Sequence, residues 1–207
     1  MAIPKKIGVL IGSVRQPRIG DQVAAFAAAT IKSQSSSTDY TLHTIDLLAW
    51  DLPMFKGPEV PKAIKDPANY THERTREWSA AISACDGFIF VPCEYNYGYP
   101  ASLKNAIDHL CWEWQGKPVM FVAYGGYGGG KSVEQLKGVL GAFDMKFTED
   151  DVLLGYPSFE WAGEKVFAGK DLGLLEEENV WAGHRDAIVK NFDELLGLTR
   201  APVIATK

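Results

Sequence analysis

The sequence is poor in cysteine and histidine, which limits how the fold can be held together. Its 207 residues include four scattered histidines and only three cysteines, Cys85, Cys93 and Cys111. The cysteines form no CxxC pair, and an odd number does not fit a disulfide framework, so we expect reduced thiols in a cytoplasmic protein. The histidines form no cluster, so no metal site is expected.

Basic residues are outnumbered, and long apolar runs are missing. Lys and Arg total 21 against 26 Asp and Glu, which gives a net charge of −5 and a pI near 5.4. This balance argues against a surface for nucleic acid. No apolar run approaches the ~20 residues of a membrane span, and the stretch 7–11 near the N-terminus is too short for a secretory signal. We therefore expect neither a nucleic acid nor a membrane as a partner.

The chain does contain an alternation of short apolar runs with amphipathic stretches. The apolar runs, interpreted as strands, are residues 7–11, 40–47, 88–91, 119–123 and 152–154. The amphipathic stretches, interpreted as helices, are residues 20–32, 72–84, 100–110, a segment from about 130 to 143, and one around 188–195. This alternation is typical of a parallel sheet covered on both faces by helices. With no repeat or linker, residues 1–207 are predicted to form a single doubly wound α/β domain with five parallel strands.

Ligands of such sheets bind beyond the carboxyl ends of the strands, which draws attention first to the loop 12–20. This loop carries Ser13, Arg15 and Arg18 and leads into a helix. A hydroxyl, two guanidinium groups and a helix N-terminus suit a phosphate. Because Val14 stands where the dinucleotide fingerprint needs a glycine, a mononucleotide is favoured over directly bound NAD. The alternative is a surface turn with two solvated arginines.

The loop 92–100, after the third apolar run, is rich in tyrosine. It holds Tyr95, Tyr97 and Tyr99 together with Asn96. Aromatic rings can wall a flat heterocycle, while the asparagine and the backbone offer hydrogen bonds. The alternative is that the tyrosines pack against neighbouring loops or against another subunit.

The loop 125–132, after the fourth apolar run, matches the phosphate-binding pattern GxxxxGK[ST]. Only 75 residues follow Ser132, whereas a nucleotide-hydrolysing core needs a domain of ~150 residues. The favoured interpretation is that Gly125 and Gly126 let the backbone approach a planar ligand where a side chain would collide.

Several strings in and around these loops resemble those of one family. They are Gly12-Ser13-Val14-Arg15, Leu52-Pro53-Met54-Phe55, residues 94–108 with the string YNYGYPASLKNAID, and Tyr124-Gly125-Gly126-Tyr127. Together they span residues 7 to about 155 and are similar to the NAD(P)H-dependent FMN reductases of flavodoxin-like fold, which include small quinone, azo-dye and chromate reductases. The resemblance implies the strand order 2-1-3-4-5. Residues 157–180 lie outside it; a surface excursion is the default expectation, and an active-site lid or a dimer arm are the alternatives.

The resemblance also implies a bound FMN and its contacts. Ser13, Arg15 and Arg18 would hold the phosphate, and Tyr97 and Tyr127 would face the substrate. The residues along the flavin would be Cys93, Glu94, Tyr95, Asn96, Tyr97, Tyr124, Gly125 and Gly126. At Pro92-Cys93 the chain departs from the Thr-Pro that is usual in the family.

The implied reaction passes a hydride from NADPH or NADH through FMN to a small acceptor, by a ping-pong mechanism. A quinone, a flavin, an azo dye or a metal oxyanion are candidate acceptors, and no catalytic side chain is required because the flavin carries the chemistry. The resemblance implies a homodimer or homotetramer. Two other functions stay open: a flavodoxin-like electron carrier, and a P-loop nucleotide-binding protein.

Overall fold

A parallel β-sheet forms the centre of the computed structural model, which describes residues 3–200. Its strands are β1 (Lys5–Ile11), β2 (Tyr40–Asp46), β3 (Gly87–Val91), β4 (Pro118–Gly125), β5 (Lys146–Phe147) and β6 (Val152–Gly155). They pair in the order β2-β1-β3-β4-β5, with β6 also paired to β4. The predicted order 2-1-3-4-5 is therefore confirmed.

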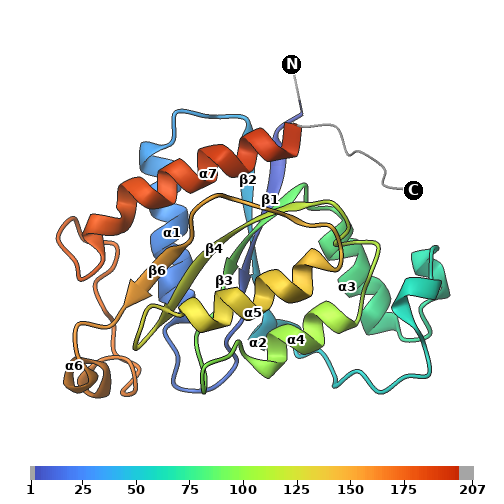
Figure 1. The fold of residues 1–207 in the computed structure, drawn as a ribbon, viewed down its shortest axis with the longest axis horizontal. Coiled ribbons are helices and arrows are strands. Elements are labelled where there is room, and N and C mark those ends of the chain that lie inside the picture. The colour runs from blue at the N-terminus through green and yellow to red at the C-terminus, as the bar shows by residue number, and fades with distance from the viewer. Residues whose placement is uncertain (1–2, 201–207) are drawn as a thin grey trace.

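Helices cover both faces of this sheet (Figure 1). They are α1 (Gly20–Gln34), α2 (Leu47–Trp50), α3 (Glu73–Ser83), α4 (Ala101–Asp108), α5 (Gly130–Gly141), α6 (Phe159–Glu164) and α7 (Arg185–Arg200). Short 3-10 turns lie at Pro61–Ala63, Pro67–Asn69 and Ala182–His184. α1 and α7 pack on one face, and α3, α4 and α5 pack on the other. Within residues 3–200 no helix is long and apolar enough to cross a membrane.

The alternation of side chains along β4 explains why the sequence shows one continuous apolar run there. Met120 and Val122 belong to the core beneath α1 and α7, whereas Val119 and Phe121 belong to the core beneath α3, α4 and α5. All eight residues of β4 are buried. A strand covered on both faces has no polar side, so it reads as apolar throughout, and each such large side chain stabilises the fold by roughly 1.5–3 kcal/mol.

The far edge of the sheet differs from the prediction of five strands. Six strands are found among the described residues, because the fifth position is shared by two of them. β5 pairs with the first residues of β4, at Pro118 and Val119, and β6 pairs with its last four residues. β5 was missed because two residues, one of them Lys146, are too few to show an apolar run.

Residues 94–108, whose string YNYGYPASLKNAID carries most of the resemblance, also hold the irregular segment 51–70 in place. The Asn105 side chain accepts a hydrogen bond from Phe55 N at 2.8 Å and donates to Pro53 O at 3.0 Å. His109 lies within 2.9 Å of the same Pro53 oxygen. α4 therefore serves as the anchor of this segment.

Candidate functional site

Loops at the carboxyl ends of four strands meet around a cavity of about 860 Å³. They follow β1, β3, β4 and β6, at the lower edge of Figure 1. The cavity is lined by Arg15, residues 17–19, 93–97, 124–127 and 156–159, Val166 and Phe167. It lies next to β1, where the strand order reverses. From β1 the chain goes to β2 on one side, and from β2 it crosses over to β3 on the other side of β1. This is the position at which doubly wound sheets bind their ligands, and the volume is in the range of a cofactor site.

Arg15 brings an uncompensated positive charge to this cavity. Its guanidinium lies over the Tyr95 ring, 4.1 Å from the ring centroid, an arrangement favoured by attraction between a cation and an aromatic face. Arg15 forms no ion pair within residues 3–200 and its side chain is exposed. The charge is therefore free to meet an anionic ligand.

Arg18 also lines the cavity, but its charge is already paired. Its two terminal nitrogens donate to the two oxygens of Asp46 at 2.7 and 2.5 Å, and one of them also donates to Ser13 O at 2.7 Å. The side chains are 9% and 24% exposed. The hydrogen bond to Arg18 lowers the pKa of Asp46. Arg18 thus ties the loop after β1 to the end of β2, a geometry that the sequence analysis missed.

Ser13 lies beneath the cavity and does not line it. Its side chain is fully buried, and the Tyr124 hydroxyl donates a hydrogen bond to Ser13 Oγ at 3.1 Å. Burial raises the pKa of Tyr124, so the hydroxyl keeps its proton and remains a donor. A Cβ at Gly20 would overlap Ser13 Oγ, which explains why α1 begins with a glycine.

The loop after β3 presents Tyr97 on a strained turn. Tyr95 and Gly98 exchange two backbone hydrogen bonds, at 2.8 and 3.0 Å. Between them Asn96 and Tyr97 have φ of 49° and 62°. Asparagine tolerates this left-handed conformation, whereas tyrosine adopts it at a cost. The Tyr97 ring is held at the cavity mouth by this turn.

The glycine-rich loop after β4 does not have the geometry of a phosphate-binding P-loop. Glu94 Oε2 accepts a hydrogen bond from Lys131 N at 3.1 Å, so a carboxylate of this chain already occupies the N-terminus of α5. The Lys131 ammonium group pairs instead with Glu134 on the solvent side, at 2.8 Å. Both features required for nucleotide binding there, a free helix terminus and an inward lysine, are missing.

The same loop offers unpaired backbone donors. Within residues 3–200 the N–H groups of Gly126 and Tyr127 donate to no protein acceptor. A Cβ at Gly126 would meet no protein atom within 4 Å, so the backbone there faces open space in the cavity lining. Free N–H groups and a free guanidinium in one cavity lining suit a ligand that carries both carbonyl oxygens and a phosphate. FMN has this combination, so the donor set fits the cofactor.

Residues 157–180, here called the arm, form another wall of the cavity. Ala162, Val166 and Leu174 of the arm are buried in the core beneath α1 and α7. Its residues 157–159, 166 and 167 line the cavity. The expectation of a surface excursion is therefore wrong. Ligands of such sheets bind beyond the carboxyl ends of the strands. The same rule, applied also to the loop after β6, would have pointed to these residues.

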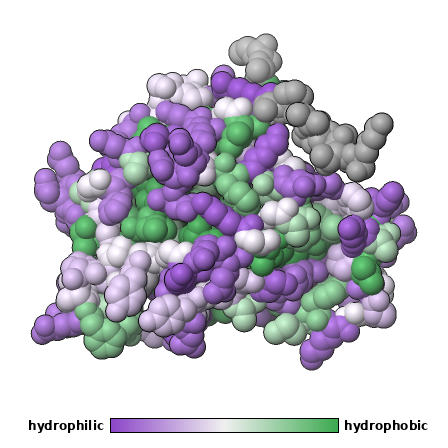
Figure 2. All heavy atoms as spheres, viewed as in Figure 1, coloured by the Kyte–Doolittle hydropathy of each residue, from purple (hydrophilic) through white to green (hydrophobic). Residues whose placement is uncertain are grey.

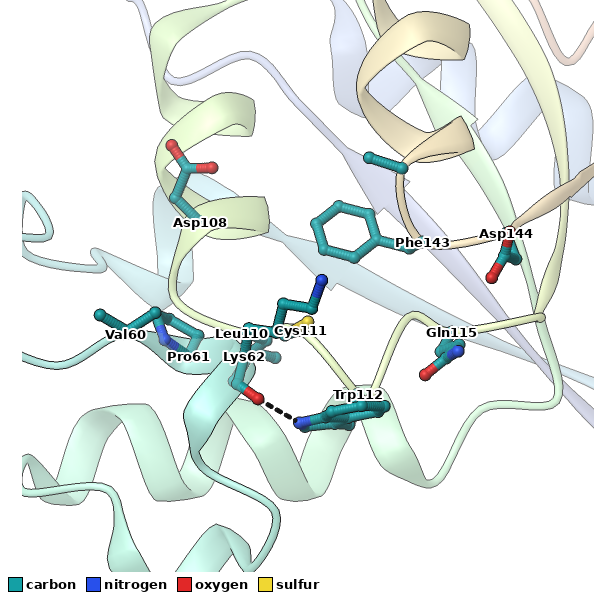
Figure 3. A pocket seen from close by; sticks show the side chains of 11 residues that line it. Val60, Pro61, Lys62, Asp108, Leu110, Cys111, Trp112, Gln115, Phe143 and Asp144 are labelled. Atoms are coloured by element: carbon teal, nitrogen blue, oxygen red, sulfur yellow. Dashed lines mark hydrogen bonds between the residues drawn. The ribbon is translucent and has the colours of Figure 1, made fainter. Parts of the chain in front are cut away.

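A second cavity, of about 410 Å³, lies at the opposite edge of the sheet. It is formed where the ends of α4 and α5 meet the irregular segment, and Trp112 Nε1 donates to Lys62 O at 3.0 Å beside it (Figure 3). This edge carries the amino end of β4. The larger cavity at the carboxyl edge is therefore the candidate active site.

Solved structures place the fold in a known class. The apo form of an NADH:FMN oxidoreductase, EMOB, aligns with a TM-score of 0.63 at 21% identity, covering 96% of this chain and 92% of that one. The strand order and the cavity beside β1 are those of a flavodoxin-like protein.

Sequence comparison then identifies the family. The sequence model of NADPH-dependent FMN reductases matches residues 5–156. The NAD(P)H-dependent FMN reductase ntnL of Nectria sp is 36% identical over 202 residues, which cover 95% of this chain and 98% of that protein. The NAD(P)H-dependent FMN reductase LOT6 of Saccharomyces cerevisiae is 41% identical over 144 residues, covering 68% of this chain and 75% of that one. The chain belongs to the NADPH-dependent FMN reductase family.

We expect Asp46→Asn to destabilise the protein by about 2 kcal/mol at pH 7, because it leaves the Arg18 guanidinium without its counter-charge. Since the folded state lowers the pKa of Asp46, its ionised form stabilises the fold above ~3.9, the pKa of an unfolded Asp. This contribution is lost as the pH falls through the lower folded value. Urea denaturation should therefore show a constant difference between the variant and the wild type from pH 7 to about pH 5, and a difference that narrows as the pH falls below ~3.9.

Asp150→Asn is the matched control for this variant. Asp150 pairs with Lys190 at 2.6 Å, but both side chains are more than half exposed, so the change should alter the stability by less than ~1 kcal/mol. Equal losses for the two variants would contradict the role given to the Arg18–Asp46 pair.

We expect Tyr97→Gly to raise the free energy of unfolding by about 1 kcal/mol, because glycine adopts the left-handed conformation without strain. Tyr127→Gly is the control. Tyr127 is also an exposed aromatic residue of the lining, but its φ is not positive. It should lose stability through the flexibility of glycine. Thermal unfolding of both variants is the measurement, and a fall of the same size in both would show that the turn stores no strain.

Proposed function

We propose that the cavity at the carboxyl edge holds FMN and receives NAD(P)H and a quinone-like acceptor in turn. Family membership makes the chain an FMN-dependent oxidoreductase that draws electrons from NAD(P)H. The observation that supports this cavity as the site is the presence, in one hollow, of the free cation of Arg15 and the free amides of Gly126 and Tyr127.

The arginines have different roles in this proposal. Arg15 would bind the phosphate directly, because no carboxylate of the described chain competes for it. Arg18 would hold the loop in place through Asp46, and the buried Ser13 hydroxyl would support the same loop through Tyr124. The amides of Gly126 and Tyr127 would receive the carbonyl oxygens of the ring system.

The lining contributes electrostatics without a catalytic acid or base. When bound, FMN supplies the chemistry, accepting a hydride from NAD(P)H and returning two electrons to the acceptor. Burial raises the pKa of the Cys93 thiol and of the Tyr95 and Tyr156 hydroxyls. These groups therefore stay neutral, and the amides and Arg15 favour a gain of negative charge in the cavity.

We infer a ping-pong order, which the shape of the site supports. With FMN bound, this single hollow of about 860 Å³ would offer the reductant and the acceptor the same place, so that each would leave before the other enters. Initial rates at several fixed acceptor concentrations should give parallel lines in double-reciprocal plots. Intersecting lines would contradict a shared face.

The assembly and the compartment are part of the same proposal. We infer a homodimer or a homotetramer, supported by the exposed apolar side chains of Val60 and Trp112, which line the second cavity, and of Met54 in the irregular segment 51–70. The three free cysteines support a reducing, cytoplasmic setting. Light scattering on the eluting protein should give at least twice the mass of 22.8 kDa, and a monomer would refute the assembly.

We expect Arg15→Ala to weaken FMN binding about tenfold, the equivalent of one charge-assisted contact. Arg18→Ala should weaken it too, but together with a loss of stability. The double variant Arg15→Ala/Arg18→Ala should bind FMN most weakly. Quenching of flavin fluorescence during titration of the apoprotein is the measurement, and unchanged affinity in the double variant would refute this phosphate site.

Lys131→Ala serves as the control and as the test of the P-loop alternative. Its ammonium group faces solvent beside Glu134, so FMN affinity should stay within twofold. Magnesium-dependent ATP binding that disappears in this variant would instead support a nucleotide-binding P-loop.

A further inference from the structure

Four exposed aromatic side chains stand at the mouth of the cavity. Phe159 and Tyr127 are 84% and 85% exposed, Tyr97 is 66% exposed and Phe167 is 46% exposed. The rings of Phe159 and Phe167 meet edge to face, with centroids 5.8 Å apart. Figure 2 shows apolar side chains at the lower left, where α6 lies, among more hydrophilic surroundings. Clustered apolar rings in solvent are typical of a binding surface.

The wall that the arm contributes carries no charge. Its lining residues are Pro157, Ser158, Phe159, Val166 and Phe167. The arm also contains Glu160, Glu164 and Lys165, and none of these lines the cavity. A wall of this kind favours an uncharged aromatic molecule and gives a hydrated ion no partner.

The arm is held firmly enough to place these rings. The Gln22 side chain of α1 donates to Lys170 O at 3.0 Å and accepts from Leu172 N at 2.8 Å. Gly169 has a φ of +64°, and a Cβ there would lie 2.6 Å from Pro17 Cβ in the loop after β1. The arm therefore rests directly on the loop that carries Arg15 and Arg18.

We propose that Phe159 and Phe167, together with Tyr127, form the acceptor wall of this enzyme and select planar, uncharged aromatic acceptors such as fused-ring quinones over small hydrated ions. This inference rests on the proposed function and adds the part of the chain that chooses the acceptor. The match to the family model ends at residue 156, and the two phenylalanines lie beyond it. The reaction balances without another reactant: NAD(P)H, one proton and a quinone give NAD(P)⁺ and a hydroquinone, which has gained two electrons and two protons.

The test compares two acceptors on the FMN-loaded enzyme. Menadione is a neutral two-ring quinone, and ferricyanide is a small hydrated anion that takes one electron, so two are used for each NAD(P)H. We expect Phe159→Ala/Phe167→Ala to lower kcat/KM for menadione about tenfold, as two lost ring contacts allow. The ferricyanide rate and the dissociation constant of FMN should stay within twofold. Leu175→Ala is the matched control, because Leu175 is an exposed apolar residue of the same arm that does not line the cavity.

A binding measurement tests the contribution of the arm to ligand affinity without catalytic turnover. Equilibrium dialysis of coumarin, a planar and redox-inert two-ring molecule, should show about tenfold weaker binding to the double variant than to the wild type or to Leu175→Ala. Coumarin affinity within twofold of the wild type, or equal losses with menadione and ferricyanide, would overturn the proposal. A wild-type protein that binds no FMN would refute the proposed function instead, and would do so before either acceptor is added.

Discussion

The parallel pairing of β1 with β2 on one side and β3 on the other is the constraint on which the site depends. Because every strand runs in the same direction, the loops after β1, β3, β4 and β6 must emerge at one edge. Because the chain continues from β2 across β1 to β3, the connections diverge there and leave a hollow that no side chain of the sheet fills. Arg15, Tyr97, Gly126 and Phe159 are far apart in the sequence but meet around this hollow.

Electrostatic pairing within the chain then decides which donors remain for a ligand. The carboxylate of Asp46 neutralises Arg18, and the carboxylate of Glu94 occupies the N-terminus of α5. Each of these positions would otherwise attract a phosphate. With both filled from within, Arg15 and the amides of Gly126 and Tyr127 are left as donors. The phosphate end and the carbonyl edge of a flavin therefore have separate places at which they would bind.

The sequence predicted those parts of the fold in which burial dictates residue type. β3 and β4 are apolar on both faces, so the sequence shows each of them as a continuous apolar run. Gly125 and Gly126 of the loop after β4 lie in the cavity lining. β5 was missed because two residues contain no periodicity. The Arg18–Asp46 pair was missed because its partners are 28 residues apart and meet only when β1 and β2 pair. Charge alone could not show which of two arginines would be neutralised.

Because the arm is separate from the loops after β1 and β4, the proposed acceptor residues and the proposed cofactor residues lie on different segments of the chain. The loops after β1 and β4 must keep a fixed backbone, since positive φ at Gly128 and Gly129 and the contacts of Ser13 leave little room for change. The arm meets the core through Ala162, Val166 and Leu174, and directly after it the Trp181 indole donates to Gly155 O at 2.8 Å. Phe159 and Phe167 point the other way, into solvent at the cavity mouth. Their side chains can therefore vary at little cost in stability, so that acceptor choice can change while the cofactor site stays the same.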